Sequence, residues 1–392
     1  MRHTVATTRT TFLTAALAIL AVAGGSEAFA QTLSPLVTFG SNGWLAPGSN
    51  PYLTTTNTER GMGWNPVTKN LVLPSRNNGN FVAIINGTTG IVSGTLDTTG
   101  VSGGTLAMMG AGVSSDGAIY VSNLASGTTS SQGTFKIYKW ASESDTSAPT
   151  TAFSSVNPGS TTGSWRFGDA FDVYGSGTAA KFASAGTTSG SSGGLANNGN
   201  FMIGQLDGSN ANTIYRAIPN TLTASNDYRL SVAFVDADTI IGNQGASAKF
   251  TDFVAATTLS NTGAIVTGSV AIGAADRPLG YTVLNGQALM AVVNSNSALI
   301  SVYDVTNPAA ATLLVTGSTV QGSITANVNG TGALQWGEVL SPTSQVLYAM
   351  SSNQGIQAMV FQAVPEPSTY AMMGGAFAVI GVIASRKRKV AA

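Results

Sequence analysis

A short apolar hairpin recurs along most of this chain and sets narrow limits on its fold. The sequence Asn-Asn-Gly-Asn-Phe stands at residues 77–81 and returns at residues 197–201, and an apolar segment follows each copy at once. Because Asn-Gly strongly favours a tight turn between two strands, each copy predicts a β-hairpin. Looser versions of this pattern raise the number of hairpins to six, spaced by roughly 50 to 60 residues, which is the range of propeller blades.

Each predicted hairpin joins a buried-looking first strand to an apolar partner. The first strands are residues 71–73, 119–121, 181–183, 240–241, 289–293 and 346–350. The partners include residues 82–85, 135–138, 202–203, 250–253, 299–303 and 356–361. A glycine-bearing segment before the hairpin supplies an innermost strand, because small residues suit strands that crowd a central axis. Examples are residues 61–64, 108–113, 171–175 and 280–283.

Several hairpins are followed by a short motif, two apolar residues and then Ser-Gly or Thr-Gly, which predicts the outermost strand of a blade. It occurs at residues 91–94, 265–268 and 314–317. The sixth unit ends at Phe361 without such a motif, and residues 36–40 resemble the missing piece. We therefore expect a strand from the N-terminus to complete the last blade. A ring closed in this way leaves no sheet edge exposed to template aggregation.

The expected fold is therefore all-β, a β-propeller of about six blades, with seven blades or a β-solenoid as alternatives. No segment predicts a long amphipathic helix. The repeat spacing resembles that of extracellular propeller-repeat proteins, and residues 166–175 resemble a segment of uncharacterised secreted bacterial propellers. The WD dipeptide and the kelch signature are missing, so these resemblances carry no catalytic residue over to this chain.

The N-terminus has the pattern of a secretory signal peptide. Arg2 and Arg9 precede an apolar stretch at residues 12–23, and Ala28 and Ala30 supply the small residues of a signal-peptidase site. We expect cleavage after residue 30, so that the mature chain begins near Gln31 and works outside the cytoplasm.

The C-terminus combines three features in a fixed order. They are the Pro365-Glu366-Pro367 motif, an apolar run at residues 370–384 and the basic tail Arg386-Lys387-Arg388-Lys389. The order resembles the PEP-CTERM sorting signal of exopolysaccharide-producing Gram-negative bacteria, and the resemblance implies that a membrane-embedded exosortase reads and cleaves it. The apolar run is shorter than the ~20 residues of a stable membrane helix, which suits a transient membrane stop. The predicted domains are a signal peptide at 1–30, a propeller body at 31–363 and the sorting signal at 364–392.

The composition of the body excludes most common enzyme mechanisms. The chain has no cysteine, and its only histidine, His3, leaves with the signal peptide. The body therefore has no thiolate nucleophile, Ser-His-Asp triad or His-ligated metal site. Residues 31–363 keep 11 basic and 15 acidic residues, a net charge of −4, and this sparse charge argues against nucleic acid as a partner.

Carboxylates remain as candidate functional groups. Their oxygens can bind calcium, and a pair of carboxyl groups can act as acid and base on a glycosidic bond. Two close pairs of aspartates stand in the body, Asp169 with Asp172 and Asp236 with Asp238, and turn capping is the favoured interpretation of both. Glu59, Glu143 and Glu338 are the only glutamates of the body. Glu338 lies on a proposed innermost strand, so we name it as a weak candidate to face a central channel.

Two further patterns have structural interpretations that outweigh functional ones. The tryptophans at residues 44, 64, 140, 165 and 336 could stack on sugar rings, but their places in the repeats favour packing between blades. The sequons at residues 86–88 and 329–331 contain Asn-Gly, which favours tight turns. Residues 186–199 are rich in Ser and Gly and predict a surface loop within the third blade.

The leading hypothesis is an exported, exosortase-sorted surface or matrix protein, a non-enzymatic propeller associated with exopolysaccharide or biofilm. Its partners are signal peptidase and exosortase during export, a transient membrane contact, and extracellular polysaccharide or surface proteins afterwards. No catalytic, cofactor or metal residue is assigned. The alternative is a carbohydrate-active hydrolase or lactonase that uses carboxylates and a calcium ion. A set of acids converging from several innermost strands would favour that alternative, and the sequence offers only Glu338 with scattered aspartates.

Overall fold

The structure is a computed structural model that describes residues 31–128, 131, 133–156, 164–188, 199–206, 215–217, 228–243, 247–252 and 264–363. The predicted signal peptide, with Ala28 and Ala30, and the predicted sorting signal from residue 364 onward lie outside these residues. One compact unit spans Thr32–Gln362. The domain boundaries expected from the sequence stay predictions.

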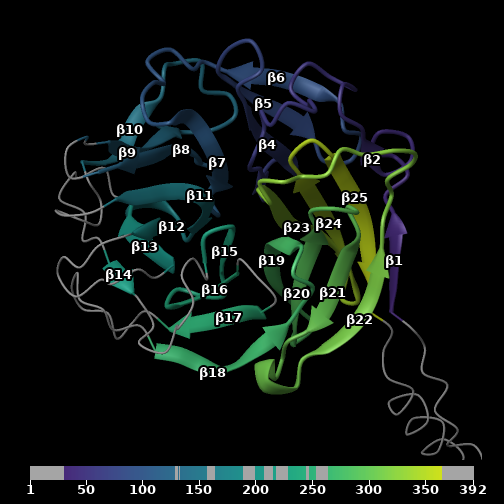
Figure 1. Cartoon of the computed structure of the whole chain (residues 1–392). Coiled ribbons are helices and arrows are strands. Elements are labelled where there is room, and N and C mark those ends of the chain that lie inside the picture. Colours follow the sequence, from purple (N-terminus) through teal and green to yellow (C-terminus); the bar gives the residue numbers. More distant parts are fainter. Residues whose placement is uncertain are drawn as a thin grey trace, which may run out of the picture. The chain divides into compact units, whose positions relative to one another are not determined.

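The described residues of the body form six successive groups of antiparallel strands, each with four main strands (Figure 1). The first three groups are β3 (Gly63–Asn65), β4 (Asn70–Ser75), β5 (Phe81–Asn86) and β6 (Val92–Leu96); β7 (Leu106–Val113), β8 (Ile119–Gly127), β9 (Thr134–Trp140) and β10 (Thr150–Val156); and β11 (Trp165–Tyr174), β12 (Lys181–Thr188), β13 (Gly199–Gln205) and β14 (Tyr215–Ala217). A short ladder between β8 and β11 joins the second group to the third.

The remaining three groups repeat the same order of strands. They are β15 (Ser231–Phe234), β16 (Thr239–Asn243), β17 (Ser247–Asp252) and β18 (Ala264–Ala271); β19 (Asp276–Leu284), β20 (Gln287–Asn294), β21 (Ile300–Asp304) and β22 (Thr312–Gly317); and β23 (Gly332–Ser341), β24 (Ser344–Ser351) and β25 (Gly355–Gln362) with the N-terminal β1 (Thr32–Pro35). The short β2 (Trp44–Leu45) pairs with the other end of β25.

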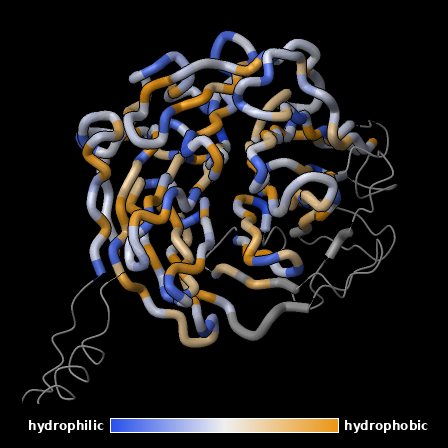
Figure 2. The backbone as a smooth tube through the Cα atoms, turned by 180° about the vertical axis from the view of Figure 1, so that it is seen from behind, coloured by the Kyte–Doolittle hydropathy of each residue, from blue (hydrophilic) through white to orange (hydrophobic). Residues whose placement is uncertain are grey.

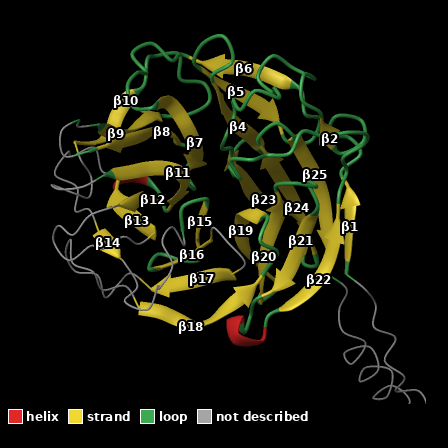
Figure 3. Cartoon of the chain, viewed as in Figure 1, coloured by secondary structure: helices red, strands yellow, loops and turns green. Residues whose placement is uncertain are grey.

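The first strands of the six groups contact one another in sequence order. β3 contacts β7, β7 contacts β11, and the series continues through β15 and β19 to β23, which in turn contacts β3. The described helical segments are two single 3-10 turns, Gly177–Ala179 and Pro308–Ala310 (Figure 3). Among the described residues no helix has the length and apolar character needed to cross a membrane.

Apolar residues fill the spaces between neighbouring groups. One cluster combines Leu71 and Ile85 of the first group with Val346 and Tyr348 of the last. Another places Phe135 and Phe182, from the second and third groups, in one aromatic stack with Phe153. Hydrophobic stretches accordingly alternate with hydrophilic ones along the backbone (Figure 2). Burial between sheets is the main source of stability in such an arrangement.

The all-β prediction is confirmed, and the predicted innermost, hairpin and outer strands coincide with strands of the structure apart from small shifts in their ends. No outer strand was predicted for the second and third groups, which use β10 and β14. Neither strand carries the short motif that marks the other outer strands.

The N-terminal strand lies four residues earlier than expected. β1 pairs with β25 from Thr32 opposite Gln362 to Pro35 opposite Met359, whereas residues 36–40 form a turn. The Phe39 amide donates to the Leu36 carbonyl within this turn, and Gly40, at a φ of 56°, adopts the left-handed conformation that follows it. The turn places Phe39 in the core against Tyr348, with 5.8 Å between ring centroids.

Gln357 of β25 ties this last group to its surroundings. Its buried side-chain oxygen accepts hydrogen bonds from Ser318 and from the Thr319 amide, and its Nε2 donates to the Ala298 carbonyl at 2.7 Å. The Thr319 hydroxyl donates in turn to the Gly43 carbonyl, next to β2.

We expect Gln357→Leu to lower the free energy of unfolding by about 2 to 4 kcal/mol, because it leaves a buried amide and a buried carbonyl without partners. Gln321→Leu is the matched control, since Gln321 is exposed, and we expect a change within about 0.5 kcal/mol. Urea denaturation of the purified body measures both. Equal effects of the two changes would contradict the structural role given to Gln357.

Candidate functional site

Four arginines gather at the edge where the first strands of the sheets begin, which we call the starting edge. The arginine cluster consists of Arg60, Arg76, Arg166 and Arg229. Arg60 precedes β3, Arg76 follows β4, Arg166 is the second residue of β11, and Arg229 precedes β15. All four side chains are partly exposed. The cluster therefore draws its charges from three of the six sheets.

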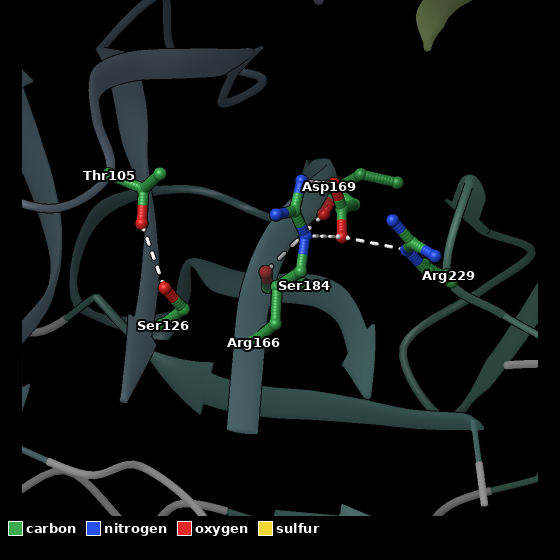
Figure 4. A network of polar contacts seen from close by, with 7 residues as sticks. Thr105, Ser126, Arg166, Asp169, Ser184 and Arg229 are labelled. Atoms are coloured by element: carbon green, nitrogen blue, oxygen red, sulfur yellow. Dashed lines mark hydrogen bonds and ion pairs between the residues drawn. The ribbon is translucent and has the colours of Figure 1, made fainter. Parts of the chain in front are cut away.

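Asp169 holds two of these arginines (Figure 4). Arg166 donates two hydrogen bonds to the Asp169 carboxylate, from Nε at 2.6 Å and from Nη2 at 2.7 Å. Arg229 approaches from the neighbouring sheet and donates from Nε to the same carboxylate at 3.1 Å. Only 1% of the Asp169 side chain is exposed, so this carboxylate depends on its cationic partners.

A bulge in β11 makes this arrangement possible. In a regular strand residues three apart point to opposite faces, so Arg166 and Asp169 would not meet. The pairing of β11 with β12 shifts between Phe167 and Ala170, which inserts extra residues on β11. Gly168 sits in this bulge at a φ of 99°, and a Cβ there would lie 2.2 Å from the Asn123 carbonyl oxygen. Glycine is therefore required at this position.

Asn57 anchors the other two arginines through its backbone carbonyl. Arg60 donates to it from Nε at 3.3 Å, and Arg76 donates from Nη2 at 2.6 Å. The Asn57 side chain is itself fixed, because its oxygen accepts hydrogen bonds from the amides of Asn329 and Asn353. Residues from the last sheet thus hold the loop that carries Arg60.

Burial changes the electrostatics of the arginine cluster. It lowers the pKa of the Arg76 guanidinium to about 10, and the positive charge of Arg60 contributes in the same direction. Burial also lowers the pKa of Arg60, whereas hydrogen bonding to Asp169 raises the pKa of Arg166. Glu59 is fully buried next to Arg60, and burial raises its pKa despite hydrogen bonds from Thr54 and Thr58.

The acids singled out by the sequence lie apart from one another. Glu338 on β23 is half exposed and forms an ion pair with Lys69 at 3.9 Å, at the edge opposite the starting edge. Glu143 accepts hydrogen bonds from the amides of Asn65 and Asn70, at 2.7 Å each, and thereby joins the second group to the first. Among the described residues no three His, Cys, Asp or Glu side chains lie close enough together to hold a metal ion.

The two predicted aspartate pairs differ in arrangement. Asp236 accepts a hydrogen bond from the Asp238 amide within a turn, as expected for turn capping, and Asp238 pairs with Lys181 at 3.7 Å. Asp169 and Asp172 diverge, because Asp172 instead accepts a hydrogen bond from the Phe234 amide of β15 at 2.8 Å. Neither pair forms a carboxylate dyad.

The tryptophans mainly pack within the body. Trp140, Trp165 and Trp336 are buried. Trp64 stacks on Tyr348 of the last group at 5.2 Å, as expected for packing between sheets. Asn86 caps a turn by accepting from the amides of Thr88 and Thr89, whereas the Ser/Gly-rich stretch lies largely outside the described residues.

The arginine cluster was missed by the sequence reasoning, which concentrated on acids and aromatics. One signal was available. Arg60 directly precedes one predicted innermost strand, residues 61–64, and Arg166 lies five residues before another, residues 171–175, so aligning the repeats would have brought them towards one edge. The arrangement presents cations and amide groups, which suits the binding of an anion.

Asp172 gives the body a specific pH dependence. Burial of the Asp172 carboxyl among protein atoms raises its pKa from 3.8 to about 6. Because the pKa of Asp172 is higher in the folded than in the unfolded state, the protonated carboxyl stabilises the fold at pH values below the unfolded pKa. This stabilisation is lost as the pH rises through about 6. We expect the stability of the wild type relative to Asp172→Asn to fall by about 1 to 3 kcal/mol between about pH 3.5 and pH 7.5.

The Asn side chain retains an acceptor for the Phe234 amide, so the comparison isolates the titration. Asp236→Asn, at an exposed turn, is the control. Urea unfolding at several pH values measures the difference, and parallel pH profiles of wild type and Asp172→Asn would contradict the prediction.

Comparison with solved structures supports the all-β architecture. The chain is similar to the crystal structure of a DUF4623 family protein from Bacteroides eggerthii, with a TM-score of 0.59 and 17% sequence identity. The similarity covers 87% of this chain and 77% of that one. At this identity it concerns the fold alone. No functionally curated protein matches the sequence.

The C-terminal residues match a known family. Residues 363–389 match the PEP-CTERM protein-sorting motif. This range includes the Pro-Glu-Pro residues 365–367 and the four basic residues 386–389. The chain therefore carries a PEP-CTERM sorting motif, which implies export, processing by an exosortase and a place at the cell surface or outside the cell.

Proposed function

We propose that this protein is a non-enzymatic binding or structural module of the extracellular matrix, built on a closed six-bladed β-propeller and associated with exopolysaccharide. The observation that carries this proposal is the sorting motif directly behind a body without cysteine or histidine. Such a body is delivered outside the cell, but it lacks the groups on which most hydrolases depend.

The propeller interpretation rests on the strand contacts. Each group of four strands places its first strand against the first strand of the next group, and β23 contacts β3. The pairing of β1 with β25 supplies the fourth strand of the last group, a common way for propellers to close their ring. Closure removes sheet edges that would otherwise pair with other chains outside the cell.

The binding role is supported by how the carboxylates are used. Glu143 and Asp169 accept hydrogen bonds from side chains of the body itself, so they serve its packing. The residues left partly exposed at the starting edge are cations and amides, which recognise ligands without transferring protons at neutral pH.

The transport route combines two cleavable ends. The predicted signal peptide sends the chain across the inner membrane, and the apolar run at 370–384 holds it there until the exosortase acts. Because that run is short and contains Gly374, Gly375 and Gly381, we propose a transient rather than a permanent anchor.

The alternative is a carboxylate- and calcium-dependent hydrolase or lactonase. The observation in its favour is Glu338, whose side chain is 45% exposed on the first strand of the last group. We expect no loss of melting temperature on chelation of calcium. Glycoside or lactone turnover that is lost in Glu338→Gln but retained in Glu143→Gln would establish the enzyme instead.

The sorting function predicts the fate of the C-terminus. Replacing Pro365, Glu366 and Pro367 by alanine should leave protein that is retained in the membrane fraction with residues 364–392 uncut. Alanine replacement of Ser368 and Thr369, just outside the tripeptide, is the matched control and should leave processing intact. Mass spectrometry of the wild-type protein tests the proposal directly, because an intact C-terminus through Ala392 would refute it.

A further inference from the structure

The starting edge is positively charged although the body as a whole is acidic. The arginine cluster brings four positive charges together, and the acids among them are Asp169 and Glu59, both buried. The cluster therefore keeps a net charge of about +2 even with both acids ionised, in a body whose net charge is −4. Arg277, the second residue of β19, stands at the same edge next to the buried Asp276, and this pair leaves the net charge of the edge unchanged.

Three guanidiniums of the arginine cluster each use one nitrogen for a hydrogen bond within the body. Arg229 uses Nε for Asp169, Arg60 uses Nε for Asn57, and Arg76 uses Nη2 for the same carbonyl. Among the described residues no hydrogen bond reaches Nη1 or Nη2 of Arg229, and Figure 4 shows this guanidinium reaching Asp169 with Nε alone. The side chain of Arg229 is 33% exposed, so its free donors are accessible.

The close approach of these cations is electrostatically unfavourable. Burial and the charge of Arg60 lower the pKa of Arg76 to about 10. The buried Nε of Arg277 has no hydrogen-bond partner among the described residues, and its side chain lies against Gly330. Gly330 follows Asn329, which hydrogen-bonds Asn57 in the cluster. An anion at this edge would offset the repulsion and supply acceptors.

We propose that the arginine cluster is a binding site for the carboxylate groups of an acidic, uronate-type oligosaccharide. This inference rests on the proposed association with exopolysaccharide and names the chemistry that would be recognised. Asp169 shows that the cluster fits a planar carboxylate, because Arg166 grips it with two parallel hydrogen bonds of 2.6 and 2.7 Å. Bidentate contacts of this kind give arginine its selectivity for carboxylates.

The neutral groups around the cluster suit a sugar. Asn57, Asn329 and Asn353 form an amide network beside Arg60 and Arg76. Thr105 and Ser126 form a pair of hydroxyl groups near Arg166 (Figure 4). Amides and hydroxyls both donate and accept hydrogen bonds, as sugar hydroxyls do. A phosphate or sulfate ion would use the cations alone, whereas an oligosaccharide uses both kinds of group.

The test is titration calorimetry of the purified body with hexagalacturonate and with its fully methyl-esterified form, at low and at physiological salt. We expect the acid to bind at least tenfold more tightly than the ester, and the difference to shrink as salt increases. Equal binding of the two forms would overturn the proposal. Because this comparison uses the wild-type protein, it holds even if a variant fails to fold.

A pair of matched variants locates the site. Arg60→Gln with Arg76→Gln removes two charges from the starting edge, and Lys69→Gln with Lys139→Gln removes two from the opposite edge. We expect at least a tenfold loss of hexagalacturonate binding for the arginine variant only, with thermal denaturation confirming that both fold. Equal losses would indicate general electrostatic attraction and would refute the site.

Two further outcomes separate this inference from the proposed function. If both sugar forms bind, and the arginine variant binds them as tightly as the wild type, the site is refuted but the glycan-binding role is kept. Absence of binding by either form would refute the site and leave that role without support. Displacement of hexagalacturonate by an equal concentration of inorganic phosphate would show a small-anion site and refute the assignment to an oligosaccharide.

Discussion

The pairing of β1 with β25 joins the beginning of the body to its end, and the other contacts between the last and first groups depend on it. Once Thr32 lies opposite Gln362, the chain turns at residues 36–40 and then continues in the same direction as β2, further along β25. This path places Phe39 against Tyr348, which stacks on Trp64 of the first group and donates from its hydroxyl to the Gly87 carbonyl. A polar strand of four residues thereby positions a buried aromatic contact that fixes two sheets together.

Carboxylates in this body mainly serve as internal acceptors. Glu143 links the first two groups, Asp172 links β11 to β15, and Asp169 gathers cations from two sheets. Buried or crowded acids need such partners, because an unpaired charge in the interior is costly. These three acids are therefore committed to holding neighbouring sheets together, whereas the guanidiniums that Asp169 holds keep part of their donors for other partners.

The sequence predicted the strands well and the polar sites poorly, for physical reasons. Strands such as residues 71–73 and 346–350 are marked by apolar runs between turns, which burial alone explains. The shift of β1 was not predictable, because it depends on the left-handed conformation of Gly40 and on the space available for Phe39. The outer strands β10 and β14 were not predicted, because an edge strand is held by backbone pairing. Such pairing requires no distinctive pattern of side chains.

The arginine cluster at the starting edge was not predicted for a different reason. Arg60 and Arg229 are 169 positions apart in the chain, and only the recurrence of sheets brings them to one place. Even within β11, the spacing of Arg166 and Asp169 predicts side chains on opposite faces, and the bulge at Gly168 reverses that expectation. A repeat architecture thus concentrates sparse charges wherever they occupy equivalent positions. In a body with few ionisable groups, that concentration determines which ligands its surface can attract.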